Sequence, residues 1–78
     1  MTITTAQIRG ARGLLNWTQQ DLSERTDISA TSIGAIENGQ TMPRESTLQA
    51  FRKAFEDAGV EFTSGDGVRK KDMKVDFY

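Results

Sequence analysis

Two short helical segments joined by a tight turn constrain this chain more than any other feature of its sequence. The first segment covers about Gln19–Thr26, with Thr18 in front of it as an N-cap. The second covers about Ala30–Asn38 and follows Ser29, another residue that favours the N-cap position. Only a few residues separate the two segments, so the chain must reverse within a single tight turn.

Two longer helices are predicted on either side of this pair. One covers about residues 6–15, with its N-cap at Thr4 or Thr5, and the other covers about residues 45–58, after a loop that contains Pro43. Each has one apolar face at helical spacing, formed by Ile8, Ala11 and Leu15 in the first and by Leu48, Phe51, Phe55 and Ala58 in the last.

After Gly59 the apolar residues alternate with polar ones, which indicates extended chain. Residues 60–62 and 68–71 are predicted as two strands, and Ser64–Gly67 reads as a hairpin loop of about four residues. An isolated hairpin is unstable in water, so these strands must pack on the helices or on another chain. Residues 72–78 either pair with a partner or fray. We therefore divide the chain into residues 1–59 and a C-terminal tail, 60–78.

The composition excludes several classes of function. The 78 residues include no Cys and no His, which excludes disulfide frameworks, the usual zinc sites and His-dependent catalytic triads. No nucleophile with a base, no separated carboxylate pair and no phosphate-cradling Gly loop can be assembled, so we expect no enzyme, cofactor or metal. The N-terminus is unlike a secretory signal, and no stretch approaches the ~20 apolar residues of a membrane span. We expect a cytoplasmic protein with no membrane partner.

The spacing of the two short segments is that of a helix-turn-helix, in which the second helix enters the major groove of DNA. The sequence resembles the phage-repressor-like, Xre-type helix-turn-helix family over about residues 6–58. The resemblance is carried by Trp17-Thr18-Gln19-Gln20-Asp21-Leu22-Ser23-Glu24-Arg25, Ser29-Ala30-Thr31-Ser32-Ile33 and Ile36-Glu37-Asn38-Gly39, with Pro43 and Thr47-Leu48 following. It implies a mostly α, compact four-helix, lambda-repressor-like domain, here with a C-terminal β-hairpin or extended tail.

The resemblance also implies roles for individual residues. The outward face of the second short helix would read DNA bases through Ala30, Thr31, Ser32 and Ala35. Their short side chains favour contacts to thymine methyl groups and single hydrogen bonds over bidentate ones. Phosphates would be contacted by Gln19, Ser29, Asn38, Arg44 and Thr47. Arg12 and Glu37 would form a structural ion pair between the first and third helices.

The sequence departs from the family pattern in three respects. Asp27 stands in the turn where the family usually has Gly, and it can enter the left-handed region only at some cost. Ser23 stands where a small Ala is usual. Cations are scarce in the part of the chain up to Arg44, where four Arg stand against four Asp and Glu, and the whole chain has a net charge of -1. We therefore expect weak non-specific affinity for DNA with a shallow salt dependence.

Together these features predict a sequence-specific DNA-binding transcriptional regulator. We expect a repressor that binds a palindromic operator in double-stranded DNA as a homodimer. The alternative is an antitoxin-like interaction module, whose tail binds a protein partner such as a toxin or an antagonist. The two functions are compatible, since antitoxins of this kind also repress.

Overall fold

The computed structural model describes residues 2–70, which form four helices followed by one β-hairpin. The helices are α1 (Thr5–Leu15), α2 (Gln19–Thr26), α3 (Ala30–Glu37) and α4 (Glu45–Asp57). The strands are β1 (Val60–Phe62) and β2 (Val68–Lys70). The four predicted helices and the hairpin are confirmed, and no helix within residues 2–70 has the length and apolar character to cross a bilayer.

Side-chain capping explains where the first three helices begin. Thr4 and Thr18 each accept a hydrogen bond from the backbone N–H three residues later, and Gln7 and Asp21 return a bond to the capping residue. Ser29 caps α3 in the same way through the N–H of Ser32, at 3.1 Å. These capping interactions are local in sequence, which is why the starts of these helices are predictable within one residue.

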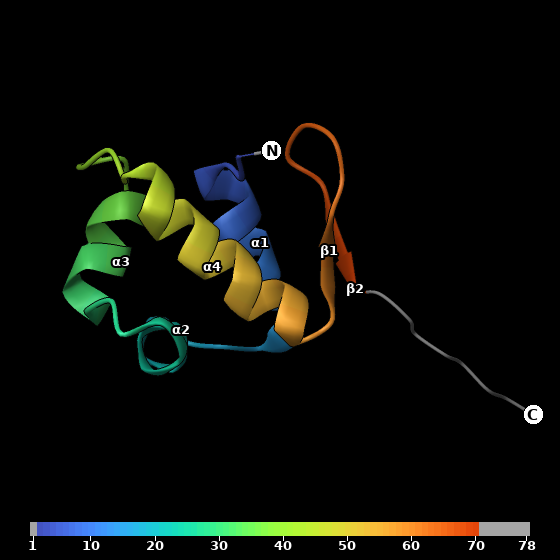
Figure 1. The fold of residues 1–78 in the computed structure, drawn as a ribbon, viewed down its shortest axis with the longest axis horizontal. Helices are drawn as coiled ribbons and strands as arrows, with labels where there is room; N and C mark the ends of the chain where they lie inside the picture. Colours follow the sequence, from blue (N-terminus) through green and yellow to red (C-terminus); the bar gives the residue numbers. More distant parts are fainter. Residues whose placement is uncertain (1, 71–78) are drawn as a thin grey trace, which may run out of the picture.

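The apolar faces of all four helices meet in one core (Figure 1). Among the described residues, its buried members are Ile3, Ile8, Ala11, Leu22, Ile33, Ile36, Phe51, Phe55 and Val60. Phe55 links the helices to the hairpin, because its ring stacks on Trp17 at 5.6 Å and meets the edge of Phe62 at 6.1 Å. Val60 is only 1% exposed, so the first strand is part of the same core.

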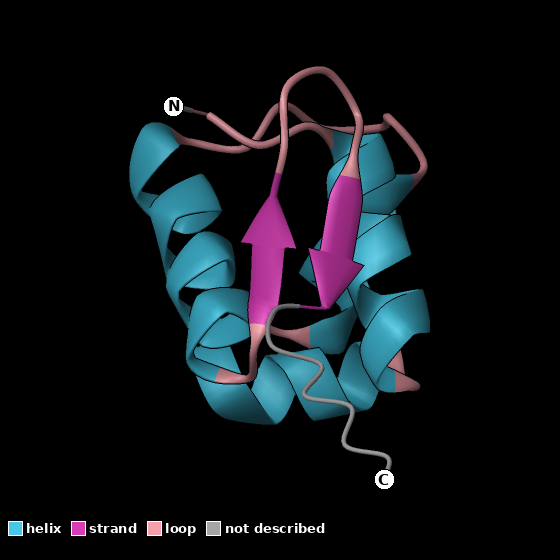
Figure 2. Cartoon of the chain, turned by 90° about the vertical axis from the view of Figure 1, so that its right-hand side faces the viewer, coloured by secondary structure: helices cyan, strands magenta, loops and turns pink. Residues whose placement is uncertain are grey.

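The hairpin lies across α1 and α4, as Figure 2 shows, with β1 against α4 and β2 against α1. Its strands are antiparallel, and Phe62 pairs with Val68 and Val60 with Lys70. The approach to α1 is close enough that a Cβ atom at Gly10 would lie 3.0 Å from the side chain of Val68. Of the two predicted solutions for the hairpin, packing on the helices is the one that residues 60–70 adopt.

Gln7 attaches the hairpin to the first helix, and sequence reasoning did not anticipate this role. Its side chain is fully buried, and its amide donates to the carbonyl oxygens of Thr63 at 3.0 Å and Gly67 at 2.9 Å. Its amide oxygen accepts from the N–H of Thr4 at 3.0 Å. The Thr4 hydroxyl in turn donates to the carboxylate of Asp66 at 2.8 Å. The first turn of α1 therefore holds both ends of the hairpin loop.

The structure corrects three details of the prediction. Ala58 is exposed rather than on the buried face of α4, because the helix ends at Asp57 and Ala58 is its C-cap. Helix α3 ends at Glu37, one residue before the predicted end, with Asn38 as its C-cap. The hairpin loop comprises residues 63–67 and is closed by a hydrogen bond from the N–H of Thr63 to the carbonyl of Gly67. The predictions for residues 71–78 lie outside the described residues.

Candidate nucleic-acid interface

Helices α2 and α3 are joined by a turn in which Asp27 adopts the left-handed conformation, with φ 63° and ψ 21°. The Asp27 N–H donates to the carbonyl of Ser23, which caps the C-terminus of α2. The hydroxyl of Thr26 donates to the carbonyl of Leu22 at 2.8 Å, and Leu22 itself is fully buried. The turn therefore forms with Asp in place of Gly, and local side-chain and backbone bonds hold it in place.

The first turn of α3 is the most exposed part of that helix. Ser29, Thr31 and Ser32 are exposed, whereas Ile33 and Ile36 on the opposite face are buried. The hydroxyl of Ser29 donates to that of Ser32 at 3.0 Å. The four predicted base-reading residues thus lie on one short helix, with Thr31 and Ser32 exposed and Ala30 and Ala35 half-buried.

Arg12 and Glu37 form a two-pronged ion pair that ties α1 to the end of α3. The Nε and Nη2 atoms of Arg12 each donate to one carboxylate oxygen of Glu37 at 2.8 Å. The side chains are 20% and 3% exposed, respectively. Arg12 also donates from Nη1 to the carbonyl of Trp17 at 3.0 Å, which extends the connection to the loop before α2. This parallel geometry is the strongest form of an Arg–carboxylate contact.

Gln19 joins this pair from the first position of α2. Its amide donates to Glu37 at 3.1 Å, so Arg12 and Gln19 share one carboxylate. The Gln19 amide also lies over Gly34, where an added Cβ would come within 3.3 Å of the Gln19 side-chain oxygen. The absence of a side chain at Gly34 therefore lets Gln19 cross α3. Gln19, a predicted phosphate contact, is therefore held in position by α3.

The negative charge of the buried Glu37 carboxylate is compensated by the groups around it. Burial is the largest effect and raises the pKa of the Glu37 carboxyl, but the hydrogen bonds from Arg12 and Gln19 and the charges of Arg12 and Arg9 leave that pKa below its ordinary value. The hydrogen bond to Glu37 raises the pKa of Arg12. Both groups therefore stay ionised near neutral pH, and the pair persists as an ion pair.

Arg9 contacts the end of α3, a role that sequence reasoning did not anticipate. Its Nη1 atom donates to the backbone carbonyl of Glu37 at 2.7 Å. A cation at this position compensates the partial negative charge of a helix C-terminus. The available signal was the spacing of Arg9 and Arg12, since residues three apart share one side of a helix.

The remaining predicted phosphate contacts lie at helix ends. Asn38 is exposed at the C-terminus of α3, before Gly39 with its φ of 76°. Arg44 is exposed at the N-cap of α4 and makes no side-chain capping bond, while Thr47 is half-buried in the first turn of that helix. Within residues 2–70, no group of three or more acidic side chains is arranged to hold a metal ion.

Comparison with known proteins agrees with this geometry. A family model described as Helix-turn-helix matches residues 8–56, which is more than half of the chain and includes α2 and α3 entirely. The comparison with curated proteins found no matching relative. The chain belongs to the Xre-type helix-turn-helix family, and it is a DNA-binding transcription regulator.

Proposed function

We propose that this regulator is a repressor and that the first turn of α3 reads the bases of its operator. The observation that carries the proposal is the contrast within α3, where Thr31 and Ser32 are exposed while Ile33 and Ile36 anchor the helix in the core. A helix held by one face and exposed at its N-terminal turn suits insertion into the major groove. Ala30 and Ala35 complete the reading surface with methyl groups, which suit thymine.

Phosphate contacts would place this surface on the duplex. The backbone N–H groups at the start of α2 and α3 favour an anion, and Gln19 and Ser29 stand at those two positions. Asn38, Arg44 and Thr47 would contact the backbone from the end of α3 and the start of α4. Arg12 is engaged by Glu37 and the carbonyl of Trp17, so its role is to fix the geometry of α1 and α3.

We further propose that residues 1–59 bind DNA while the tail, residues 60–78, provides the contact between two copies. The described part of the chain offers few cations for general attraction to DNA, so two linked reading helices would supply the affinity that one lacks. Within residues 2–70 the hairpin is two-stranded, so in this part of the chain the outer edge of each strand carries no further strand and could pair with another chain. Such a dimer would place its two α3 helices about one helical turn of DNA apart, roughly 34 Å.

Selection of bound sequences from random duplexes at two salt concentrations tests this function. A dimeric reader should enrich a palindrome whose half-sites are about 10 base pairs apart, centre to centre. Enrichment of a single half-site would contradict the dimer but preserve base reading. No enrichment at low salt would contradict base reading and favour the antitoxin-like alternative, in which the tail binds another protein.

Removal of the two exposed hydroxyl groups in the first turn of α3 is predicted to lower the affinity for the operator. The double substitution Thr31→Ala and Ser32→Ala should lower operator affinity about tenfold, because two single hydrogen bonds to bases are lost. The Ser29 cap remains, so the midpoint of thermal unfolding should change little. Fluorescence anisotropy with the selected operator measures the affinity, and Gln49→Ala on the exposed face of α4, outside both the predicted DNA contacts and the tail, is the control. Unchanged affinity of the double variant would show that α3 does not read bases through these groups.

A further inference from the structure

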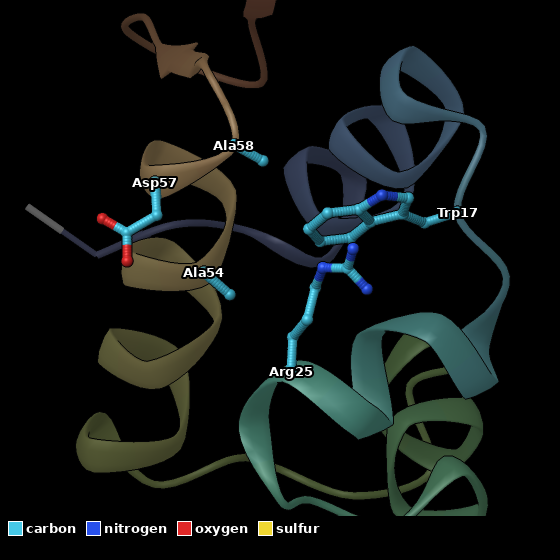
Figure 3. Close-up of a pocket in the computed structure, with 5 residues that line it drawn as sticks. All are labelled: Trp17, Arg25, Ala54, Asp57 and Ala58. Atoms are coloured by element: carbon cyan, nitrogen blue, oxygen red, sulfur yellow. The ribbon is translucent and has the colours of Figure 1, made fainter.

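A pocket of about 330 Å³ opens between α2, α4 and the loop that follows α1. It is lined by Trp17, Arg25, Ala54, Asp57 and Ala58. Figure 3 shows that the two alanines face the indole ring across the hollow, while the side chain of Arg25 rises from α2 beneath it. The pocket exists because Ala54 on α4 and Ala58 at the C-cap of that helix, four residues apart, leave space that larger side chains would fill. Its volume is at the lower end of the range of small-ligand pockets, about 300–1,000 Å³.

The chemistry of the pocket suits an aromatic side chain next to a carboxylate. Trp17 is half-buried, stacks on Phe55 and has the guanidinium of Arg25 at 4.2 Å from its ring centroid. Arg25 is exposed, and it makes no salt bridge within residues 2–70. The pocket thus combines an aromatic wall with a cation whose hydrogen-bond donors remain available to an anion.

The chain leaves the described structure close to this pocket. The last residue of β2, Lys70, pairs with Val60, and paired residues on neighbouring strands are about 5 Å apart. Val60 is two residues after Ala58, a separation of at most about 7 Å. Seven further residues span up to about 25 Å when extended. Residues 71–77 therefore have ample length to cross from the end of β2 to the far wall of the pocket.

We propose that the pocket is an intramolecular docking site for the chain's own residues 74–77. The sequence there is Lys74-Val75-Asp76-Phe77. The ring of Phe77 would occupy the space between Trp17 and the two alanines, and the carboxylate of Asp76 would pair with Arg25. This contact would hold the C-terminal segment against α2, which packs on α3. The proposal is independent of the repressor function and of the dimer.

The chain provides its own probe, because Trp17 is its single tryptophan. In the full chain, nuclear Overhauser contacts between the Phe77 ring and the Trp17 indole are expected. Phe77→Ala should remove one aromatic contact and lower the ratio of docked to undocked chains about two- to tenfold. Acrylamide should then quench Trp17 fluorescence more strongly. Met42→Ala removes an apolar side chain that is 87% exposed elsewhere and should leave the quenching unchanged.

An exchange of the charges at residues 76 and 25 distinguishes this contact from the non-specific effects of shortening a side chain. Asp76→Lys should abolish the Phe77–Trp17 contact, and adding Arg25→Glu to the same chain should restore it. The proposal is overturned if the wild-type chain shows no such contact, or if the exchange fails to restore it. It is also overturned if mixed samples of labelled and unlabelled chain show the contact between different molecules, since a second copy would then be the occupant.

Discussion

Replacement of Arg12 by alanine is expected to destabilise the protein by about 3–5 kcal/mol, a large share of the stability of a domain this small. The substitution leaves the Glu37 carboxylate, whose side chain is 3% exposed, without its ionic partner. It also removes the bond to the carbonyl of Trp17, which connects α1 to the loop before α2. Urea unfolding followed by circular dichroism measures the loss.

An exposed ion pair provides the matched control. Lys53 and Asp57 pair at 3.2 Å, but their side chains are 78% and 67% exposed. Lys53→Ala should therefore change the free energy of unfolding by less than about 0.5 kcal/mol. Equal losses for Arg12→Ala and Lys53→Ala would show that the Arg12–Glu37 pair contributes no more than a surface contact.

A double substitution separates the structural role of the pair from its role in placing Gln19. Arg12→Met combined with Glu37→Leu replaces a buried ion pair by apolar side chains, which is often neutral for stability. Most of the stability lost in Arg12→Ala should return. The operator affinity of the double variant should be lower than that of the unsubstituted chain, because Gln19 has lost the carboxylate that accepts its hydrogen bond. Full recovery of both properties would contradict the positioning role.

Replacement of Gln7 by leucine is expected to cost about 2–4 kcal/mol, because buried polar groups lose their partners while the side-chain volume is nearly kept. The carbonyls of Thr63 and Gly67 would lose a donor, and the N–H of Thr4 would lose an acceptor. The hairpin should separate from α1 before the helices unfold, so amide hydrogen exchange in residues 60–70 should accelerate more than exchange in α3. Hydrogen exchange followed by NMR measures both regions.

Gln49→Leu is the control for this second prediction. Gln49 is exposed and donates to Glu45, one turn away at 2.9 Å, so the loss of this surface contact should cost less than about 0.5 kcal/mol. Uniform acceleration of exchange across Gln7→Leu would mean that the hairpin and the helices unfold as one unit, and the attachment role of Gln7 would then be wrong. The same result would argue against treating residues 60–78 as a separable unit.

Deletion of the chain after Gly59 is a poor test of what the tail does. Val60 is buried in the core, and the hairpin loop satisfies the amide of Gln7. Removing these residues would destabilise the helices themselves, so a loss of operator binding would not reveal a dimer. Point substitutions in the full chain avoid this ambiguity.

The elements of the fold were predictable because their signals are local. Thr4, Thr18 and Ser29 cap the next turn of backbone, and the apolar spacing of α4 identifies the face that Phe51 and Phe55 bury. The limit of this reasoning appears at Ala58. Spacing assigns it to the buried face, but the helix ends at Asp57, and Ala58 borders an open pocket.

Contacts between side chains that are far apart in the sequence were predictable only in part. The family resemblance implies the Arg12–Glu37 pair, and the two residues are in contact. Neither spacing nor composition indicated that Gln19 shares this carboxylate or that Gly34 makes room for it. These contacts depend on how closely α1, α2 and α3 approach one another.

By itself, the sequence determined the order and the starts of the helices, the tight turn at Asp27 and the resemblance that identifies the family, because capping, turn conformation and apolar spacing act within a few residues. Only the tertiary structure decided that the hairpin packs on α1 and α4 and that Gln7 satisfies its loop. It also decided that Gln19 is oriented by Glu37. In an unfolded chain a polar side chain can form hydrogen bonds with many different groups. The packing of helices that are distant in the sequence decides which of these groups lie within reach.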